Sequence, residues 1–317
     1  MSGLPPAGCV RTVLGDLPAA ALGFTSCHEH LVTAPGERFR GGDDDLLLDD
    51  PVAAAVELTR FGAAGGRAVV EVSTEEFGRD AAALARLSAR TGIHVVAATG
   101  HVCEAQWAGV VDVGARSERE LEEEIVRDLL EGIPGSGGVR AGAIKVGTSE
   151  GGATAAEARL LRAAARAQAH TGAPIVTHTT RGTAGVEQAR ILLAAGADPA
   201  HVQIGHQDLR LDPAAHREIL ATGCAIAFDS CGKERHAPDA ERIAHLLALI
   251  EEGHGDRLLL GGDMARRSDW TSWGGGPGLT HLPWRIVPWL VAAGADPAAA
   301  RRLVVANPAA LLAWAPR

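Results

Sequence analysis

The sequence lacks the features that mark several broad classes of protein. No apolar stretch approaches the roughly 18 residues that a membrane span requires. There is no basic block, and a net charge of −9 argues against nucleic acid or an anionic membrane as a partner. The opening residues, MSGLPPAGCVRT, lack a basic segment followed by an apolar one, so we expect no signal peptide and a cytoplasmic location.

The five cysteines are odd in number and widely spaced. They form no CxxC pair, which argues against a disulfide scaffold and against a thiolate zinc site. We therefore expect free thiols at Cys9, Cys27, Cys103, Cys224 and Cys231.

Lysine is almost absent, although the chain carries 30 lysines and arginines together. The only two lysines are Lys145, in the apolar segment AGAIKVGT, and Lys233. Burial and neighbouring cations disfavour a charged ammonium. A lysine amine that loses its proton can react with carbon dioxide to give an anionic carbamate, whereas arginine stays protonated. Lys145 is therefore a candidate for a carbamate that bridges two metal ions.

Short apolar runs alternate with helical patterns along the chain, which predicts a parallel sheet covered by helices. Eight such runs in about 240 residues fit a closed (β/α)8 TIM barrel, an α/β fold. The predicted strands are 22–28, 68–74, 93–99, 140–147, 173–178, 202–206, 224–229 and 257–262. No linker divides the sequence, so we expect a single domain over residues 1–317, with a short hairpin at about 9–20 that closes the barrel floor.

Three of the helical segments carry clear end signals. They begin near Asp50, Ser117 and Thr154. Glu120 and Glu157 follow the last two by three positions, which is the pattern of a capping box. Each segment ends at a glycine, as helix C-termini commonly do.

Metal-binding side chains recur at or near the C-terminal ends of the predicted strands. A (β/α)8 barrel places its chemistry at this end. Residues i and i+2 of a strand share a face, so His28 and His30 can bind one ion together. The whole set, in chain order, is His28, His30, Lys145, His178, His206 and Asp263. A single histidine on a strand is usually a packed core residue, but the ordered set predicts a metal site.

Four imidazoles, one carboxylate and one carbamate suffice for two divalent ions with open positions, and zinc, manganese or cobalt would fit. We assign one ion to His28, His30 and Asp263. The other ion is assigned to His178 and His206. The carbamate of Lys145 and a hydroxide would bridge the two ions. Asp263 would take the proton of the attacking hydroxide and pass it to the leaving group, so Asp263 and Lys145 are the predicted catalytic residues.

Nearly the whole chain resembles the phosphotriesterase family of the amidohydrolase superfamily. The resemblance rests on TVLGDLPAAALGFTSCHEHL, EVSTEEFGRDAAALARLS, HVVAATG, RAGAIKVGTS, LLRAAARAQAHTGAPIVTHT, VQIGHQD and NPAALL. It implies a (β/α)8 barrel, a binuclear site usually filled with zinc, and a carboxylated lysine. The ligands of that family fall on the six residues named above, with none missing.

Two departures from the family bear on the substrate. Organophosphate-hydrolysing members carry a proton-relaying histidine just after strand seven, and lactonases of acyl-homoserine lactones carry an arginine there. This chain has Ser230 in that position. Those lactonases also use a tyrosine after strand three, and this chain has no tyrosine. The sequence thus differs from both groups.

The segments FDSCGK and DMARRSDWTSWGGGPGL are similar to a branch that includes hydrolases of phosphorylated sugar lactones. In that branch a lysine after strand seven and an arginine after strand eight bind the substrate phosphate. The resemblance places these roles on Lys233 and on Arg266 or Arg267, while Asp269 stands near an aromatic position of the branch. His101, at the end of the third strand, is a further candidate to face the substrate, with structural packing as the alternative.

The sequence therefore predicts a binuclear metal-dependent hydrolase of an ester bond, in particular a lactonase for a phosphorylated sugar lactone. A broad-specificity phosphotriesterase or aryl esterase is an alternative, and Ser230 counts against it. A non-catalytic metal-containing binding protein is another, and the complete ligand set counts against it. A mononuclear deaminase would need a glutamate near His178, and IVTHTTRGTAG has none. We expect a small-molecule substrate and a homodimer, but fold alone selects no substrate.

Several other polar residues receive structural interpretations. Glu29 points to the opposite face from its two histidine neighbours and is expected to support them. Asp208 would orient His206 or cap its loop. The acidic run Asp43–Asp45 is expected to be a solvated loop, and residues 264–279 a shaped loop over the site.

Overall fold

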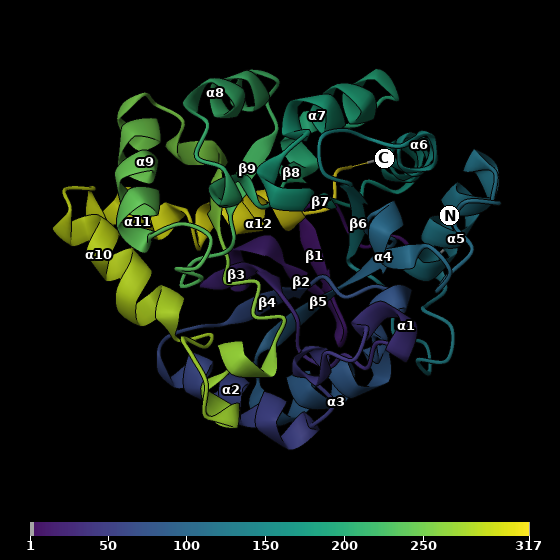
Figure 1. The fold of residues 1–317 in the computed structure, drawn as a ribbon, viewed down its shortest axis with the longest axis horizontal. Helices are drawn as coiled ribbons and strands as arrows, with labels where there is room; N and C mark the ends of the chain where they lie inside the picture. The colour runs from purple at the N-terminus through teal and green to yellow at the C-terminus, as the bar shows by residue number, and fades with distance from the viewer. Residues whose placement is uncertain (1–2, 317) are drawn as a thin grey trace.

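Eight parallel strands form the centre of the molecule (Figure 1). The computed structural model describes residues 3–316. Each strand is hydrogen-bonded to the next one along the chain. They are β3 (Thr25–Glu29), β4 (Ala68–Glu71), β5 (His94–Gly100), β6 (Ala143–Thr148), β7 (Ile175–Thr179), β8 (Val202–Ile204), β9 (Ala225–Phe228) and β10 (Leu258–Leu260). All eight overlap the predicted ranges.

A buried glutamate joins the segment after the last strand, β10, to the first strand, β3. Glu29, which ends β3, accepts hydrogen bonds from the backbone nitrogens of Gly262 (2.9 Å) and Met264 (3.0 Å). Between them, the backbone nitrogen of Asp263 donates to the carbonyl oxygen of His28 (2.9 Å). Because these bonds join the two ends of the sheet, it curls into the predicted, nearly closed (β/α)8 barrel. Glu29 has the supporting role expected of it.

Helices surround the barrel (Figure 1). After β3 to β9 come α2 (Pro51–Ala63), α3 (Ala81–Thr91), α5 (Glu118–Leu130), α6 (Ala155–Thr171), α7 (Gly185–Ala194), α8 (Pro213–Ala221) and α9 (Asp239–Glu251). After β10 come the π-helix η10 (Leu282–Ile286), α10 (Val287–Ala292), α11 (Pro297–Arg302) and α12 (Ala306–Leu312). The capping boxes predicted at Ser117 and Thr154 both form. Within residues 3–316, every helix is too short or too polar to cross a bilayer.

The hairpin predicted near the start of the chain helps to close one end of the barrel. Its strands, β1 (Cys9–Thr12) and β2 (Gly15–Pro18), pair antiparallel. Val10 of the hairpin belongs to the same buried apolar cluster as Leu311 and Leu312 of α12 and the inward-facing residues of the barrel strands. Because side chains fill this end, the C-terminal ends of the strands are the open end of the barrel.

A glutamate of α2 holds the long loop after β10 in one shape. Glu57 is fully buried. Its Oε2 accepts hydrogen bonds from Thr271 Oγ1 (2.8 Å) and Ser272 N (3.0 Å), and its Oε1 accepts one from Leu279 N (3.0 Å). Trp270 of the same loop is also buried. The loop therefore has a defined shape, as expected for residues 264–279.

We predict that Glu57→Gln destabilises the protein, because an amide nitrogen cannot accept a hydrogen bond from a buried donor of this loop. Bonds to a charged acceptor contribute about 1.5–3 kcal/mol each, and a loss of this size would be measured by urea unfolding followed by tryptophan fluorescence. Glu251→Gln, on the exposed face of α9, is the control and should leave the midpoint unchanged. An unchanged midpoint for Glu57→Gln would contradict this account of the loop.

Candidate metal centre

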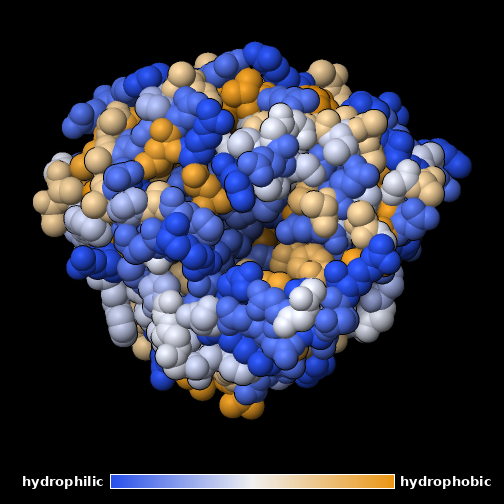
Figure 2. Space-filling model, in the orientation of Figure 1, coloured by the Kyte–Doolittle hydropathy of each residue, from blue (hydrophilic) through white to orange (hydrophobic). Residues whose placement is uncertain are grey.

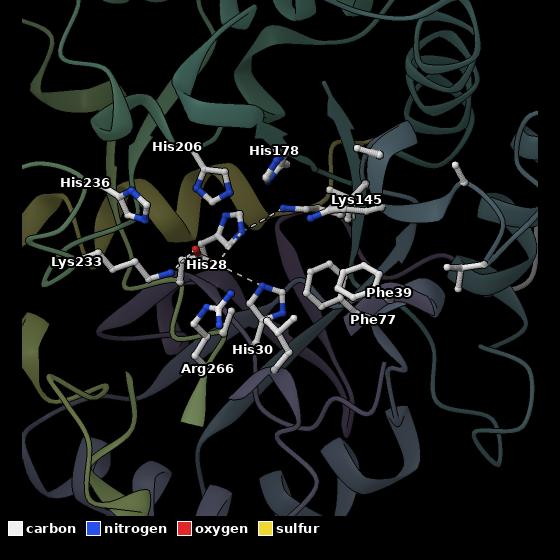
Figure 3. Close-up of a pocket in the computed structure, with 18 of the residues that line it drawn as sticks. His28, His30, Phe39, Phe77, Lys145, His178, His206, Lys233, His236 and Arg266 are labelled. Atoms are coloured by element: carbon white, nitrogen blue, oxygen red, sulfur yellow. Dashed lines mark hydrogen bonds and ion pairs between the residues drawn. The ribbon is translucent and has the colours of Figure 1, made fainter. Parts of the chain in front are cut away.

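The six predicted ligands meet in one cavity at the C-terminal ends of the strands, where their side chains converge (Figure 3). The residues that line it include His28, His30, Lys145, His178, His206 and Asp263. The ring of His206 lies between two others, with its centroid 4.6 Å from that of His28 and 4.6 Å from that of His178. The fold thus brings together residues that are more than 230 positions apart in the sequence.

Two of the six residues have backbone conformations that are rare outside glycine. The φ angle is 57° at His206 and 48° at Asp263, just after β8 and β10. Such conformations cost on the order of 1–3 kcal/mol and cluster at functional sites. The strain is therefore consistent with a functional role for both positions.

Asp229, directly after β9, joins two of the histidines. Its Oδ2 lies 2.9 Å from His28 Nδ1, and its Oδ1 lies 2.8 Å from His206 Nδ1. Burial alone would raise the pKa of this fully buried carboxyl, but the neighbouring His206 and His28 hold its pKa well below the usual range. Asp229 is therefore ionised, and each ring can donate its Nδ1 proton to it. That arrangement leaves the Nε2 lone pair of each ring available to a metal.

The other two histidines are held in a similar way. His30 Nδ1 lies 2.7 Å from Ser73 Oγ, and His178 Nε2 lies 3.1 Å from Thr180 Oγ1. Burial lowers the pKa of both imidazoles, which favours the neutral form that binds metals. Each of the four histidines therefore has one ring nitrogen fixed by the protein and the other available as a ligand.

Lys145 lies in this centre without an anionic partner. Its buried Nζ is 3.2 Å from His28 Nε2 and 3.4 Å from the carbonyl oxygen of Thr177. No carboxylate within residues 3–316 forms an ion pair with it. Burial lowers the pKa of Lys145 to about 8, so an uncharged amine is accessible near neutral pH. These surroundings are compatible with the predicted carbamate.

Asp263 faces the histidines with one oxygen and a lysine with the other. Its Oδ1 lies 3.3 Å from His30 Nε2 and 3.8 Å from His28 Nε2. Its Oδ2 accepts a hydrogen bond from Lys233 Nζ. Burial opposes ionisation, but the charge of Lys233 and the hydrogen bond with His30 hold the pKa of Asp263 well below its usual range. Asp263 thus links the ligand cluster to the wall of the cavity.

The donor atoms present fit a divalent metal ion. One ligand atom from each of His28, His30 and Asp263 lies within 4.8 Å of the other two. Ligand atoms of His28, His206 and Asp229 also lie within 4.8 Å of one another. Asp229, however, contacts the Nδ1 atoms of both rings, so we assign it the role of orienting them and not that of a ligand. Imidazole nitrogens with a carboxylate oxygen are donors that suit zinc.

The predicted substrate-binding residues do not all reach the cavity. Lys233 and Arg266 line it. The guanidinium of Arg267 is turned away, because it bonds to the carbonyl oxygen of Leu47 (2.6 Å) and to Asp49 (2.6 Å). Of the two alternatives, Arg266 is therefore the one that lines the cavity, and Arg267 lies outside its lining.

His101 has a structural position. Its Nδ1 lies 3.1 Å from Glu76 and its Nε2 lies 3.3 Å from Glu124. Burial alone would lower its pKa, but the two carboxylates raise the pKa of His101 to about 9, so the ring is a buried cation. Because both ring nitrogens are engaged and the residue does not line the cavity, we correct the prediction that it binds substrate.

The acidic run Asp43–Asp45 is largely exposed to solvent, as expected, but it also contacts the loop after β10. Asp43 lies 2.6 Å from the guanidinium of Arg266, and Asp45 accepts a hydrogen bond from Ser268 N (2.8 Å). The first loop of the barrel is therefore tied to the last one. This contact holds Arg266 at the cavity.

Ser230, in the position of the usual proton relay, is fully buried away from the cavity lining. Its backbone nitrogen donates to Asp208 (3.0 Å), as does that of Asp229 (3.2 Å). The guanidinium of Arg242 also donates to Asp208 (2.7 Å). Asp208 therefore fixes the chain after β9, which is closer to the loop-capping role than to a direct contact with the histidine.

Comparisons with known proteins agree with this geometry. The sequence model of the phosphotriesterase family matches residues 8–312. The chain belongs to the phosphotriesterase family.

Three similar proteins show the breadth of this likeness. The phospho-furanose lactonase of Mycoplasmopsis synoviae is 29% identical over 323 residues, which cover 96% of this chain and 91% of the relative. The structure of the lactonase Lmo2620 from Listeria monocytogenes has a TM-score of 0.92 and 32% identity, covering 97% of this chain and 100% of that one. The phosphotriesterase homology protein of Escherichia coli, complexed with phosphate in its active site, has a TM-score of 0.88 and 34% identity, covering 92% and 99%.

This member of the phosphotriesterase family is accordingly a metal-dependent hydrolase of ester bonds, of the lactonase or phosphotriesterase type. The sequence alone did not single out Asp229 as part of its site. The residue stands in FDSC at the end of the predicted strand 224–229. A carboxylate at the same barrel end as the six ligands was the available signal.

We predict that Asp229→Asn weakens metal binding by about 10–100-fold, the usual effect of losing a carboxylate that orients metal-binding histidines. Competition with a chelating dye for zinc measures the affinity. Asp256→Asn, at an exposed ion pair with Arg302, is the control. Equal zinc affinities of the Asp229→Asn variant and the wild type would show that the bridge does not prepare the ligands.

Proposed function

We propose that this protein is a binuclear metal hydrolase that opens a lactone bearing an anionic group, as in phosphorylated sugar lactones. The observation that carries the proposal is a group of basic side chains on the cavity wall beside the candidate metal centre: Lys233, Arg235, His236 and Arg266. In Figure 3, Lys233 and His236 lie to the left of the histidines, and Arg266 lies below His28, between Lys233 and His30.

The six predicted ligands divide into two sets in this proposal. His28, His30 and Asp263 would hold one divalent ion, and His178 and His206 the other. Zinc is our first choice, with manganese or cobalt as alternatives. When bound, two such ions activate water at neutral pH and polarise the carbonyl of an ester.

The Lys145 carbamate would lie between the two ligand sets. An ammonium without a carboxylate partner is costly inside a protein. Carboxylation replaces this buried cation, which only the more distant charges of Asp229 and Asp263 balance, by an anion among four imidazoles. The short distance from Lys145 Nζ to His28 Nε2, 3.2 Å, supports this position for the bridge.

Asp263 is the proposed proton acceptor. Its side chain is 19% exposed and lines the cavity, so it can reach an attacking water and a leaving group. Ser230 is buried and cannot relay that proton to solvent directly. This arrangement favours a lactonase over the alternative of a broad phosphotriesterase or aryl esterase that depends on a histidine relay.

The basic wall would hold the anionic group of the substrate. Charge-assisted bonds from arginine and lysine are the usual means of binding phosphate. Two relatives support this role. One is a phospho-furanose lactonase, and the structure of the other, from Escherichia coli, holds phosphate in its active site. Paraoxon, aryl esters and lactones with and without phosphate form the substrate panel that separates the two candidate activities.

We predict about two divalent ions per chain after expression in zinc- or manganese-supplemented medium, determined by elemental analysis. Lys145→Arg should reduce this content to one ion or less, because a guanidinium cannot be carboxylated. Circular dichroism should show an intact barrel for the variant. A wild-type content of one ion or less would refute the binuclear centre, and full loading of Lys145→Arg would refute the carbamate.

A second prediction concerns the choice between phosphorylated and unphosphorylated lactones. Arg266→Met should lower the ratio of their kcat/KM values about tenfold or more, since one charge-assisted bond contributes about 1.5–3 kcal/mol. The matched control is Arg267→Met, whose guanidinium points away from the cavity and whose loss should leave the ratio unchanged. Equal ratios in both variants and the wild type would contradict the assignment of Arg266.

A further inference from the structure

Part of the cavity lining is apolar. Its residues are Phe39 of α1 (Glu37–Arg40), Leu46, Phe77 of the 3-10 helix η3 (Glu75–Phe77), Val102 and Val110. In Figure 3, Phe39 and Phe77 lie on the far side of His28 and His30 from Lys233 and His236. Figure 2 likewise shows hydrophobic residues along one edge of the central hollow and hydrophilic residues along the other.

This apolar wall is a packed structure that begins at the metal centre. The ring of Phe77 stacks on His30, with centroids 4.9 Å apart and planes 22° apart. Phe39 meets Phe77 edge to face at 4.5 Å. Val102 belongs to the same buried cluster as Phe77. A group held against this wall would therefore lie next to the atoms that react.

The wall offers few hydrogen-bond partners to a hydroxylated substrate. Apart from the predicted ligands and the basic residues named above, Gln106 and Arg38 are the polar residues that line the cavity. Arg38 is exposed, and its guanidinium lies against the backbone of Gly109 at the rim. A sugar hydroxyl that loses its water without gaining a partner is disfavoured, whereas an alkyl group gains from burial.

We infer that the substrate carries an apolar substituent on the side of its scissile carbonyl opposite the anionic group. The inference rests on the proposed lactonase function and narrows its substrate class. The cavity, with a volume of about 390 Å³, seats the anion at the basic wall and the ester bond at the centre. It seats a short alkyl or acyl chain between Phe39, Phe77 and Val110. Among the anionic lactones of the proposed function, one with an alkyl substituent beside the ester therefore matches both walls better than one that is hydroxylated there.

The test uses five-membered lactones that carry a phosphomethyl group on one ring carbon. The carbon next to the carbonyl carries a hydroxyl, methyl, ethyl or propyl group. With the metal-loaded full-length protein, kcat/KM should rise about fourfold for each added methylene, and the hydroxyl compound should be slower than the methyl compound. A flat series, or a hydroxyl compound as good as the methyl one, overturns the inference.

Two double variants assign the effect to the wall. Leu46→Asn with Val110→Thr makes the wall polar while keeping the number and branching of the side-chain heavy atoms, and it should abolish most of the dependence on chain length. Leu46→Met with Val110→Ile keeps the wall apolar and should preserve that dependence. Both positions tolerate change, since Val110 is 37% exposed and Leu46 is only partly buried. Equal chain-length dependence in the two double variants overturns the inference.

Binding separates this inference from the lactonase proposal. If no lactone of the series is hydrolysed, the lactonase proposal fails, and the wall is then judged by calorimetric titration with methyl- to butylphosphonate. Affinity should still rise by about fourfold per methylene in the wild type and remain nearly constant in Leu46→Asn with Val110→Thr. Affinities independent of chain length in the wild type would refute the apolar subsite itself.

Discussion

The site depends on one buried carboxylate, that of Asp229. Its two oxygens each contact the Nδ1 atom of a different histidine, so a single side chain fixes His28 on the first strand and His206 beyond the sixth. Together with Asp263, the same anion compensates the charge of a region that also holds four imidazoles and Lys145. Without it, the rings would be free to rotate, and the centre would lose both its orientation and part of its charge balance.

The loops above this centre are held by charged contacts that also shape the cavity. Glu57 binds the loop after β10 through three hydrogen bonds, and Asp43 binds Arg266 of the same loop. A substrate anion would therefore meet a guanidinium that is already in place, which reduces the ordering cost of binding. Fixed basic residues on one side and packed aromatic residues on the other define the direction in which a substrate can lie.

Much of the fold and of the site could be predicted because simple periodic rules apply to them. Apolar runs separated by capped helices located all eight strands, and the rule that barrels work at the C-terminal strand ends collected the six candidate ligands. The substrate side was predicted less well. Arg266 and Arg267 are neighbours in sequence, and only their partners, Asp43 and Asp49, decide which one faces the cavity. His101 has the strand-end position of a site residue, yet Glu76 and Glu124 engage both of its ring nitrogens.

The sequence by itself determined the barrel, the family and the identity of the candidate ligands, because strand and helix periodicity and the chemistry of His, Lys and Asp are local properties. Tertiary structure decided what depends on contacts between distant segments. It placed Asp229 between two histidines and left Lys145 without a carboxylate partner. It also placed Phe39 and Phe77 on the opposite side of the candidate metal centre from Lys233. Side-chain direction and pairing arise only when the strands close into a ring, so no local pattern could have specified them.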